Sequence, residues 1–234
     1  MTKTLIKGGT IISMDRKIGD FPKGDVLVDG DRIEKIGKSL RSPGAKVIDA
    51  TGMIVMPGFV NAHIHTWQTG IRGVAGNWSI PEYLHEMHAR IAPRYTANDT
   101  YLGNLVGALN QINVGATTIF DWCHNNATPG HTDAAIEGLR EAGIRALFGH
   151  GSPKPDAKEG ALPFTHIPHP RSELERLRKG TLSDKDGLIT LAMAALGVDF
   201  STWEVVEHDF RLAKELNLLI STHVWGAPNR LNPD

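Results

Sequence analysis

Short apolar segments separated by glycine-containing turns fill the first 56 residues of the chain. In the clearest case, segments 25–28 and 32–36 flank Asp29-Gly30-Asp31, where glycine supplies the positive φ of a hairpin turn. Two more pairs of segments follow this pattern: 5–7 with 10–14 around Gly8-Gly9, and 47–50 with 53–56 around Thr51-Gly52. We therefore predict a small antiparallel sheet. It is too small to be stable alone, so we expect it to pack on another part of the protein.

Beyond residue 65 the pattern changes to amphipathic helices that alternate with short apolar strands. Leu102, Leu105 and Leu109 recur at helical spacing, for example, and Gly115 ends that helix. Such alternation is typical of a parallel sheet with crossover helices, either open or closed into a barrel. The first helix is expected to be capped by Thr96 or Asn98 and to end at Gly115, and the second to begin at Thr132 and stop at Gly143. Further helices are expected at 172–179 and 203–216, and the strands are expected to end near residues 65, 121, 149, 194 and 223.

Two histidines end the first of these strands. Side chains alternate between the faces of a strand, so His63 and His65 point the same way and Ile64 points the other way. Two imidazoles on one face suit a divalent metal such as Zn²⁺. A bare pair of this kind is common by chance, but here the Pro57-Gly58 turn and the strand formers that follow it support a strand end.

Other residues with metal-binding or acid–base side chains also lie where the predicted strands end. The carboxyl ends of parallel strands meet at one edge of a sheet, and the chemistry of α/β proteins collects there. The residues at these ends are His63, His65, Asp121, His150 and His223. Their common position argues for a site more strongly than any single residue does. For Asp121 and the nearby His124, local capping is the alternative.

Composition narrows the class of protein. The 234 residues suffice for one large or two modest domains, and 41% hydrophobic and 22% charged residues are ordinary for a globular protein. A net charge of −1 gives no reason to expect nucleic acid or an anionic membrane as partner. The longest apolar run, 188–198, is too short to span a bilayer. Eleven histidines is a high count.

The single cysteine and the first residues of the chain indicate the cellular compartment in which the protein is expected. Cys123 cannot form an internal disulfide, and we expect a small buried side chain rather than a nucleophile. The first four residues lead into a strand pattern without the apolar core of a signal peptide. Both features predict a cytoplasmic protein.

Together these motifs resemble the amidohydrolase superfamily. The resemblance rests on VIDATG at 47–52 followed by PGFVNAHIH at 57–65. It is closer to the cytosine deaminase and chlorohydrolase branch, which includes adenosine-type, guanine and triazine hydrolases. IRG at 71–73, IPEYL at 80–84 and GATT at 115–118 continue it in order, so it covers essentially the whole chain.

The resemblance implies an α/β fold, a (β/α)₈ TIM-type barrel with a small β-sandwich assembled from both chain ends. Residues 1–56 would be the N-terminal part of the sandwich, and 57–234 the first five βα units of the barrel. A closed eight-stranded barrel needs about 250 residues. Five strands cannot close a barrel, so we expect this chain to be part of a longer protein or to need a complementing segment.

The resemblance also implies that His63 and His65 ligate one metal ion and that His223 is a third ligand. Relatives with two metals carry a lysine on the fourth strand, whereas here Lys185 lies before that strand. This favours a single divalent metal, Zn²⁺ first and Fe²⁺ as the alternative. Further ligands and the general acid or base would follow Asp234, so no catalytic residue is assigned.

Three residues are candidates for substrate binding. Trp67 and Gln68 lie on the loop after the first strand and His150 follows the third strand, with ordinary loop or structural roles as the alternatives. Purine and thioether deaminases of the family commonly carry a glutamate where this chain has Gly226, which argues against a purine bound through that carboxylate. Most other histidines are expected to face solvent: His85, His88, His131, His166, His169 and His208.

The function expected from these features is hydrolysis of a non-peptide carbon–nitrogen bond, with deamination of a small aminated heterocycle as the first choice. A bound divalent metal lowers the pKa of its water from 15.7 to about 7, which makes hydroxide available. Opening of a cyclic amide or dechlorination by the same fold is the first alternative. A catalytically incomplete fragment is the second. Dimers are common among such relatives, so a homo-oligomer is left open.

Overall fold

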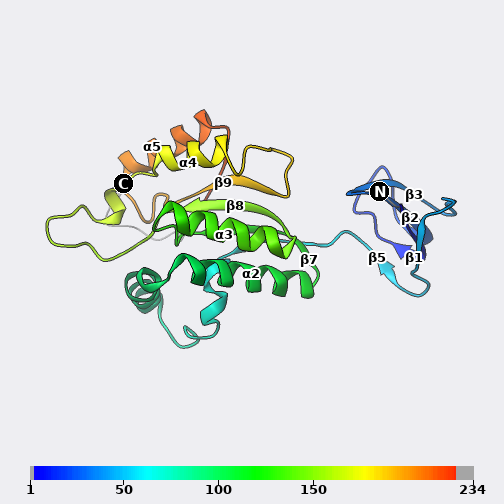
Figure 1. Cartoon of the computed structure of the whole chain (residues 1–234), viewed down its shortest axis with the longest axis horizontal. Coiled ribbons are helices and arrows are strands. Elements are labelled where there is room, and N and C mark those ends of the chain that lie inside the picture. The colour runs from blue at the N-terminus through cyan, green and yellow to red at the C-terminus, as the bar shows by residue number, and fades with distance from the viewer. Residues whose placement is uncertain (1–2, 225–234) are drawn as a thin grey trace. The chain divides into compact units, whose positions relative to one another are not determined.

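The structure is a computed structural model that describes residues 3–224 (Figure 1). The chain divides into two compact units, residues 1–58 and residues 59–234. The sequence pattern predicts the boundary between residues 56 and 57. Along the part described, no helix is long and apolar enough to cross a membrane.

The first unit is a five-stranded mixed sheet in the order β3-β2-β1-β4, with β5 also paired to β1. The predicted hairpin of β2 with β3 is present. Leu5, Leu27 and Leu40 form its small core. The strands are β1 (Thr4–Ile11), β2 (Phe21–Asp29), β3 (Arg32–Gly37), β4 (Lys46–Asp49) and β5 (Ile54–Val55).

Two of the predicted hairpins in this unit are wrong. Segments 5–7 and 10–14 do not form a hairpin, because β1 runs through Gly8 to Ile11, with irregularities in its register against β2. Gly8 has φ +80, which glycine adopts at no steric cost, so the strand bends without ending. The strands β4 and β5 do not pair with each other. Each lies parallel to a different half of β1, so the sheet is mixed rather than antiparallel.

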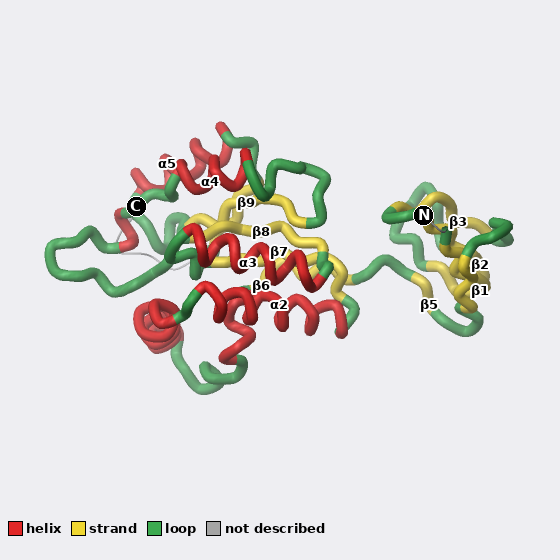
Figure 2. The backbone as a smooth tube through the Cα atoms, viewed as in Figure 1, coloured by secondary structure: helices red, strands yellow, loops and turns green. Residues whose placement is uncertain are grey.

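The second unit has the predicted five parallel strands, in the order β10-β9-β8-β7-β6. The strands are β6 (Phe59–Ile64), β7 (Ala116–Cys123), β8 (Arg145–Gly151), β9 (Ile189–Ala195) and β10 (Leu219–Thr222). The long helices are α2 (Ala97–Asn113), α3 (Pro129–Ala142), α4 (Arg171–Lys179) and α5 (Trp203–Glu215), and they run alongside the strands as Figure 2 shows. Thr96 caps α2 through a capping box with Asp99. The unit is a partial TIM-type barrel.

The two faces of the parallel sheet carry different residues. Ile119, Phe148 and Met193 point to the helix side and belong to the main core. Phe120 and Trp122 point to the other face and form a separate cluster with small side chains of β9. Ile64 packs against the helix-side core, so the alternation along β6 turns His63 and His65 to the face of Trp122.

The segment between β6 and α2 is mostly helical rather than the loop that its sequence predicts. It contains the 3₁₀ helix η1 (Thr66–Ile71), the short α1 (Ile80–Glu82), the π-helix η2 (Tyr83–Ile91) and the 3₁₀ helix η3 (Ala92–Arg94). Ser79 and Glu82 form a capping box at the start of α1. This segment follows His65 directly, so it forms one wall of the region around the strand ends.

Candidate metal centre

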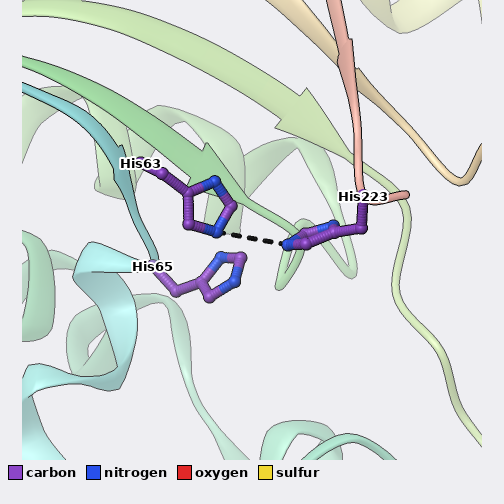
Figure 3. A group of neighbouring side chains, drawn as sticks. All are labelled: His63, His65 and His223. Atoms are coloured by element: carbon purple, nitrogen blue, oxygen red, sulfur yellow. Dashed lines mark hydrogen bonds between the residues drawn. The ribbon is translucent and has the colours of Figure 1, made fainter. Parts of the chain in front are cut away.

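Three imidazoles from opposite edges of the parallel sheet meet at its carboxyl end (Figure 3). His63 lies in β6, His65 follows β6, and His223 follows β10. One ring nitrogen of each residue lies within 4.8 Å of the others. The Nε2 atoms of His63 and His223 are 3.2 Å apart. Two nitrogens bound tetrahedrally to zinc at about 2.0–2.1 Å are separated by roughly 3.3 Å. The spacing of this pair therefore fits a shared metal ion.

The orientation of His65 is fixed by the neighbouring strand. Its Nδ1 lies 2.7 Å from the backbone carbonyl oxygen of Trp122. A carbonyl oxygen only accepts, so Nδ1 carries the proton and Nε2 keeps its lone pair for a ligand bond. Metal-binding histidines usually have such a second partner, which holds the ring in place.

Burial, which is partial for these side chains, favours the neutral form of the three imidazoles. It lowers the pKa of His65 to about 3 and that of His223 to about 4, with the neighbouring imidazoles adding to the effect. Burial also lowers the pKa of His63. Only a neutral imidazole has a free lone pair, so the three rings are in the form that a metal requires at neutral pH.

A second layer of aromatic rings supports His65 from behind. The ring of His124 stacks on that of His65, with centroids 4.3 Å apart and planes 14° apart. Trp67 donates a 2.9 Å hydrogen bond from Nε1 to Nδ1 of His124. His88 meets the ring of His124 edge-on at 4.3 Å. All three supporting residues are buried. The position of His124 at a strand end makes it a candidate for the site, with local capping as the alternative, whereas the sequence predicts that His88 faces solvent.

A buried carboxylate joins β7 to the start of η1. Asp121 is fully buried and accepts hydrogen bonds from the backbone N–H of Thr66 and from Nδ2 of Asn104. Burial raises the pKa of Asp121 to about 6. Thr66 is the residue after His65, so Asp121 fixes the backbone next to a proposed metal ligand. The carboxylate lies on the helix side of the sheet rather than beside the three imidazoles.

The sequence profile of the Amidohydrolase family matches residues 54–233, which is most of the chain. The chain belongs to the amidohydrolase family. It is 32% identical over 151 residues to a 5'-deoxyadenosine deaminase of Methanosarcina mazei, covering 64% of this chain and 34% of that protein. A 5-methylthioadenosine/S-adenosylhomocysteine deaminase of Caldicellulosiruptor saccharolyticus is 28% identical over 233 residues, covering 97% and 50%. The chain thus spans half the length of these curated relatives, or less.

Solved structures share the fold at low identity. The atrazine chlorohydrolase of Arthrobacter aurescens TC1 in complex with zinc superposes with a TM-score of 0.78 at 22% identity, covering 95% of this chain and 53% of that chain. An adenosine deaminase of Xanthomonas campestris with bound zinc gives 0.71 at 18%, covering 95% and 49%. The predicted partial barrel of this amidohydrolase is confirmed.

Among the predicted substrate-binding residues, Gln68 lies near one of the three imidazoles, that of His65. It lines a cleft of about 410 Å³ together with His65 and Arg72. Its Nε2 donates a 2.7 Å hydrogen bond to the hydroxyl of Tyr83, another residue of this cleft. Trp67 is buried in the core with no exposed surface. Trp67 does not line the cleft, and its hydrogen bond to His124 holds the ring that stacks on His65.

His150 lies apart from the imidazole cluster of this amidohydrolase. Its Nδ1 is 2.9 Å from Nε2 of His169, and its ring contacts Phe148 on the helix side of the sheet. Burial lowers the pKa of His150 to about 4 and that of His169 to about 3. The expectation that His88 and His169 face solvent is wrong, since the segments around them fold over the sheet and bury both. Gly226 lies outside the described residues.

Proposed function

We propose that the protein is a metal-dependent hydrolase that acts on non-peptide carbon–nitrogen bonds, and that it deaminates an aminated heterocycle. One observation carries the proposal. His63, His65 and His223 bring three neutral ring nitrogens within 4.8 Å of one another at the carboxyl edge of a parallel sheet. This edge is where TIM-type barrels carry their active sites.

The donor set fits a single divalent metal, with zinc as our first choice. Three imidazole nitrogens leave room for further ligands around the ion, as catalytic zinc sites require. A metal held there would lower the pKa of a water molecule towards neutrality and so supply a nucleophile. No carboxylate among residues 3–224 completes the three-histidine group, so we assign no general acid or base.

In this proposal some residues around the imidazoles hold the ligand rings in place and others bind the substrate. The Trp122 carbonyl fixes the ring of His65, and His124 stacks behind it. The cleft that Gln68 and Arg72 line together with His65 would hold the heterocycle next to this proposed metal ligand. The curated relatives named as deaminases support an aminated heterocycle as the substrate class. A free, buried cysteine suits a reducing compartment, and we place the protein in the cytoplasm.

Dechlorination is the second candidate, favoured by the similarity to the atrazine chlorohydrolase structure. Attack of water on a ring carbon is shared by both reactions, and the leaving group distinguishes them. Loops around the strand ends decide which one a given member performs.

The proposal is tested by metal analysis and by product detection on the same preparation of the intact protein. We expect about one zinc per protein and release of ammonia from one or more members of a panel of aminated heterocycles. His63→Asn and His223→Asn should lose both, while the exposed His166→Asn keeps both. Chloride release from chlorinated rings without ammonia would favour the second candidate. Absence of bound metal after zinc supplementation would refute the metal-dependent reaction.

A further inference from the structure

A buried lysine lies on the same side of the sheet as the three imidazoles. Lys154 belongs to the loop after β8, and only 7% of its surface is exposed. Its Nζ lies over the ring of Trp122, 5.0 Å from the centroid. The same indole ring contacts His223 at 4.5 Å and His65 at 5.7 Å between centroids. The indole ring of Trp122 therefore contacts both the ammonium group of Lys154 and the rings of two of the three proposed ligands.

The ammonium group is close enough to act on the imidazoles electrostatically. Burial is the largest cause of the lowered pKa values of His65 and His223, the neighbouring imidazoles come next, and the charge of Lys154 adds to them. It acts in the same way on His88 and His124 behind them. Four imidazoles from four segments of the chain thus share this positive neighbour.

This cation has no anionic partner among residues 3–224. None of the ion pairs or hydrogen bonds formed there includes Lys154, and its ring contact with Trp122 is the interaction that remains. Buried charges in proteins are normally paired, because an isolated ion loses its hydration without compensation. Burial lowers the pKa of Lys154 to about 7, which is the response of an unpaired ammonium.

A second donor beside the ammonium is also unpartnered. The indole N–H of Trp122 is buried and has no acceptor in the described part of the chain. Trp122 is 1% exposed, and an indole N–H in such a place usually finds a partner. An ammonium and an indole N–H are both donors only, so an oxygen acceptor would satisfy both, and a negative charge on it would compensate the lysine.

We propose that Lys154 and the indole N–H of Trp122 bind a carboxylate carried by the heterocyclic substrate. The inference rests on the proposed function, because it names the class of substrate that the same site takes. Lys154 is then a specificity-determining residue. It selects anionic rings over neutral ones of the same shape, and the carboxylate also offsets the positive charge of a metal held by the imidazoles.

The test compares two ligands that differ in charge alone, an aminopyrimidine carboxylate and the matching carboxamide. Their binding to the intact protein is measured by calorimetry after metal removal with a chelator, and again with zinc. We expect the carboxylate to bind about 10–100-fold more tightly in both states, as for a charge-assisted hydrogen bond in a buried site. Lys154→Met should abolish this preference and leave carboxamide binding within about threefold, since methionine keeps the apolar stem.

Three further variants sharpen the comparison. Lys154→Arg keeps the charge and should retain part of the preference. Trp122→Phe keeps the ring but removes the N–H, so it should reduce the preference several-fold. Lys158→Met is the matched control from the exposed part of the same loop and should change nothing. Thermal unfolding checks that each variant is folded.

Each of three results would overturn the inference. Equal binding of both ligands by the unaltered protein would mean that Lys154 is paired by a group of the protein itself. Equal weakening of both ligands in Lys154→Met would mean a structural role. A preference that appears only with zinc would mean that the metal binds the carboxylate. Zinc content and ammonia release test the proposed function separately, so the two failures are distinguishable.

Discussion

The Nδ1 atom of His65 and the backbone carbonyl oxygen of Trp122 lie 2.7 Å apart and join the carboxyl ends of β6 and β7. This contact selects the tautomer of His65 that leaves Nε2 free. Because the acceptor is a backbone atom, the contact depends on the strand pairing of β6 with β7 rather than on the identity of residue 122.

Metal affinity should therefore depend on His65 and not on the indole of Trp122. We expect His65→Asn to weaken zinc binding at least 100-fold, because it removes one of the three proposed imidazole ligands. Trp122→Phe keeps the carbonyl, so its zinc affinity should stay within about threefold. The exposed His85→Asn is the control. Competition against a chromogenic chelator measures all three, and tight zinc binding by His65→Asn would exclude this residue as a ligand.

Asp121 should be important for stability. Asp121→Leu leaves the backbone N–H of Thr66 without an acceptor and removes one of the two acceptors of the Asn104 amide, which keeps its hydrogen bond to the Ala135 carbonyl, at a cost of about 3 kcal/mol. Adding Asn104→Leu removes the amide that lost this acceptor and should recover part of the loss. Urea unfolding at pH 7 measures the free energies of unfolding. A loss below about 0.5 kcal/mol in the single variant would mean that the two hydrogen bonds contribute nothing net.

The pH dependence of stability should reflect the imidazoles whose pKa values burial lowers, and the pair His150 and His169 is the part of this set that lies away from the candidate metal centre. Burial lowers their pKa values from 6.5 to about 4 and about 3, so between pH 6.5 and 4 the unfolded chain binds protons that the folded chain does not. Stability is therefore lost as the pH falls through this window, by about 2 kcal/mol per imidazole between pH 7 and 5. Asp121, with its raised pKa, acts in the opposite direction but is a single group.

Unfolding at a series of pH values tests this. His150→Gln removes one of the titrating imidazoles, so the number of protons taken up on unfolding near pH 5 should fall by up to about one. His166→Gln, at an exposed position, should leave the slope unchanged. An identical slope in His150→Gln would show that this imidazole does not couple to folding.

Two glycines of α3 should respond oppositely to alanine. A Cβ at Gly138 would lie 2.5 Å from the carbonyl oxygen of Tyr101 in α2, so the two helices would have to separate. We expect Gly138→Ala to cost about 2 kcal/mol or more. At Gly130 the nearest atom is 3.6 Å away, and alanine there should be neutral or slightly stabilising. Equal unfolding midpoints for the two variants would contradict the close helix packing.

The sequence predicts the parallel half of this fold well because its signals are local. The helical spacing of apolar residues places α2 to within a few residues, and the short apolar segments place the ends of β7 and β8 with similar accuracy. The first unit is harder, since which part of β1 receives β4 and which receives β5 depends on pairing between distant segments. A turn signal at Thr51-Gly52 indicates a change of direction but not the partner strand.

The residues of the candidate site also separate into those that the sequence predicts and those that it does not. His63 and His65 follow from alternation along a strand, and His223 follows from the resemblance. The burial of His88 in a π-helix and of Lys154 in a long loop has no periodic signal, because it arises when segments fold over the sheet. Such residues are found only once the contacts around Trp122 and His124 are known.

A crystal of the intact protein grown with zinc, with diffraction recorded above and below the zinc absorption edge, tests the central claim most directly. We predict one anomalous peak about 2.0–2.1 Å from a ring nitrogen of each of His63, His65 and His223. A fully zinc-supplemented crystal with no peak between these three rings, or with its peak on other residues, would contradict the account.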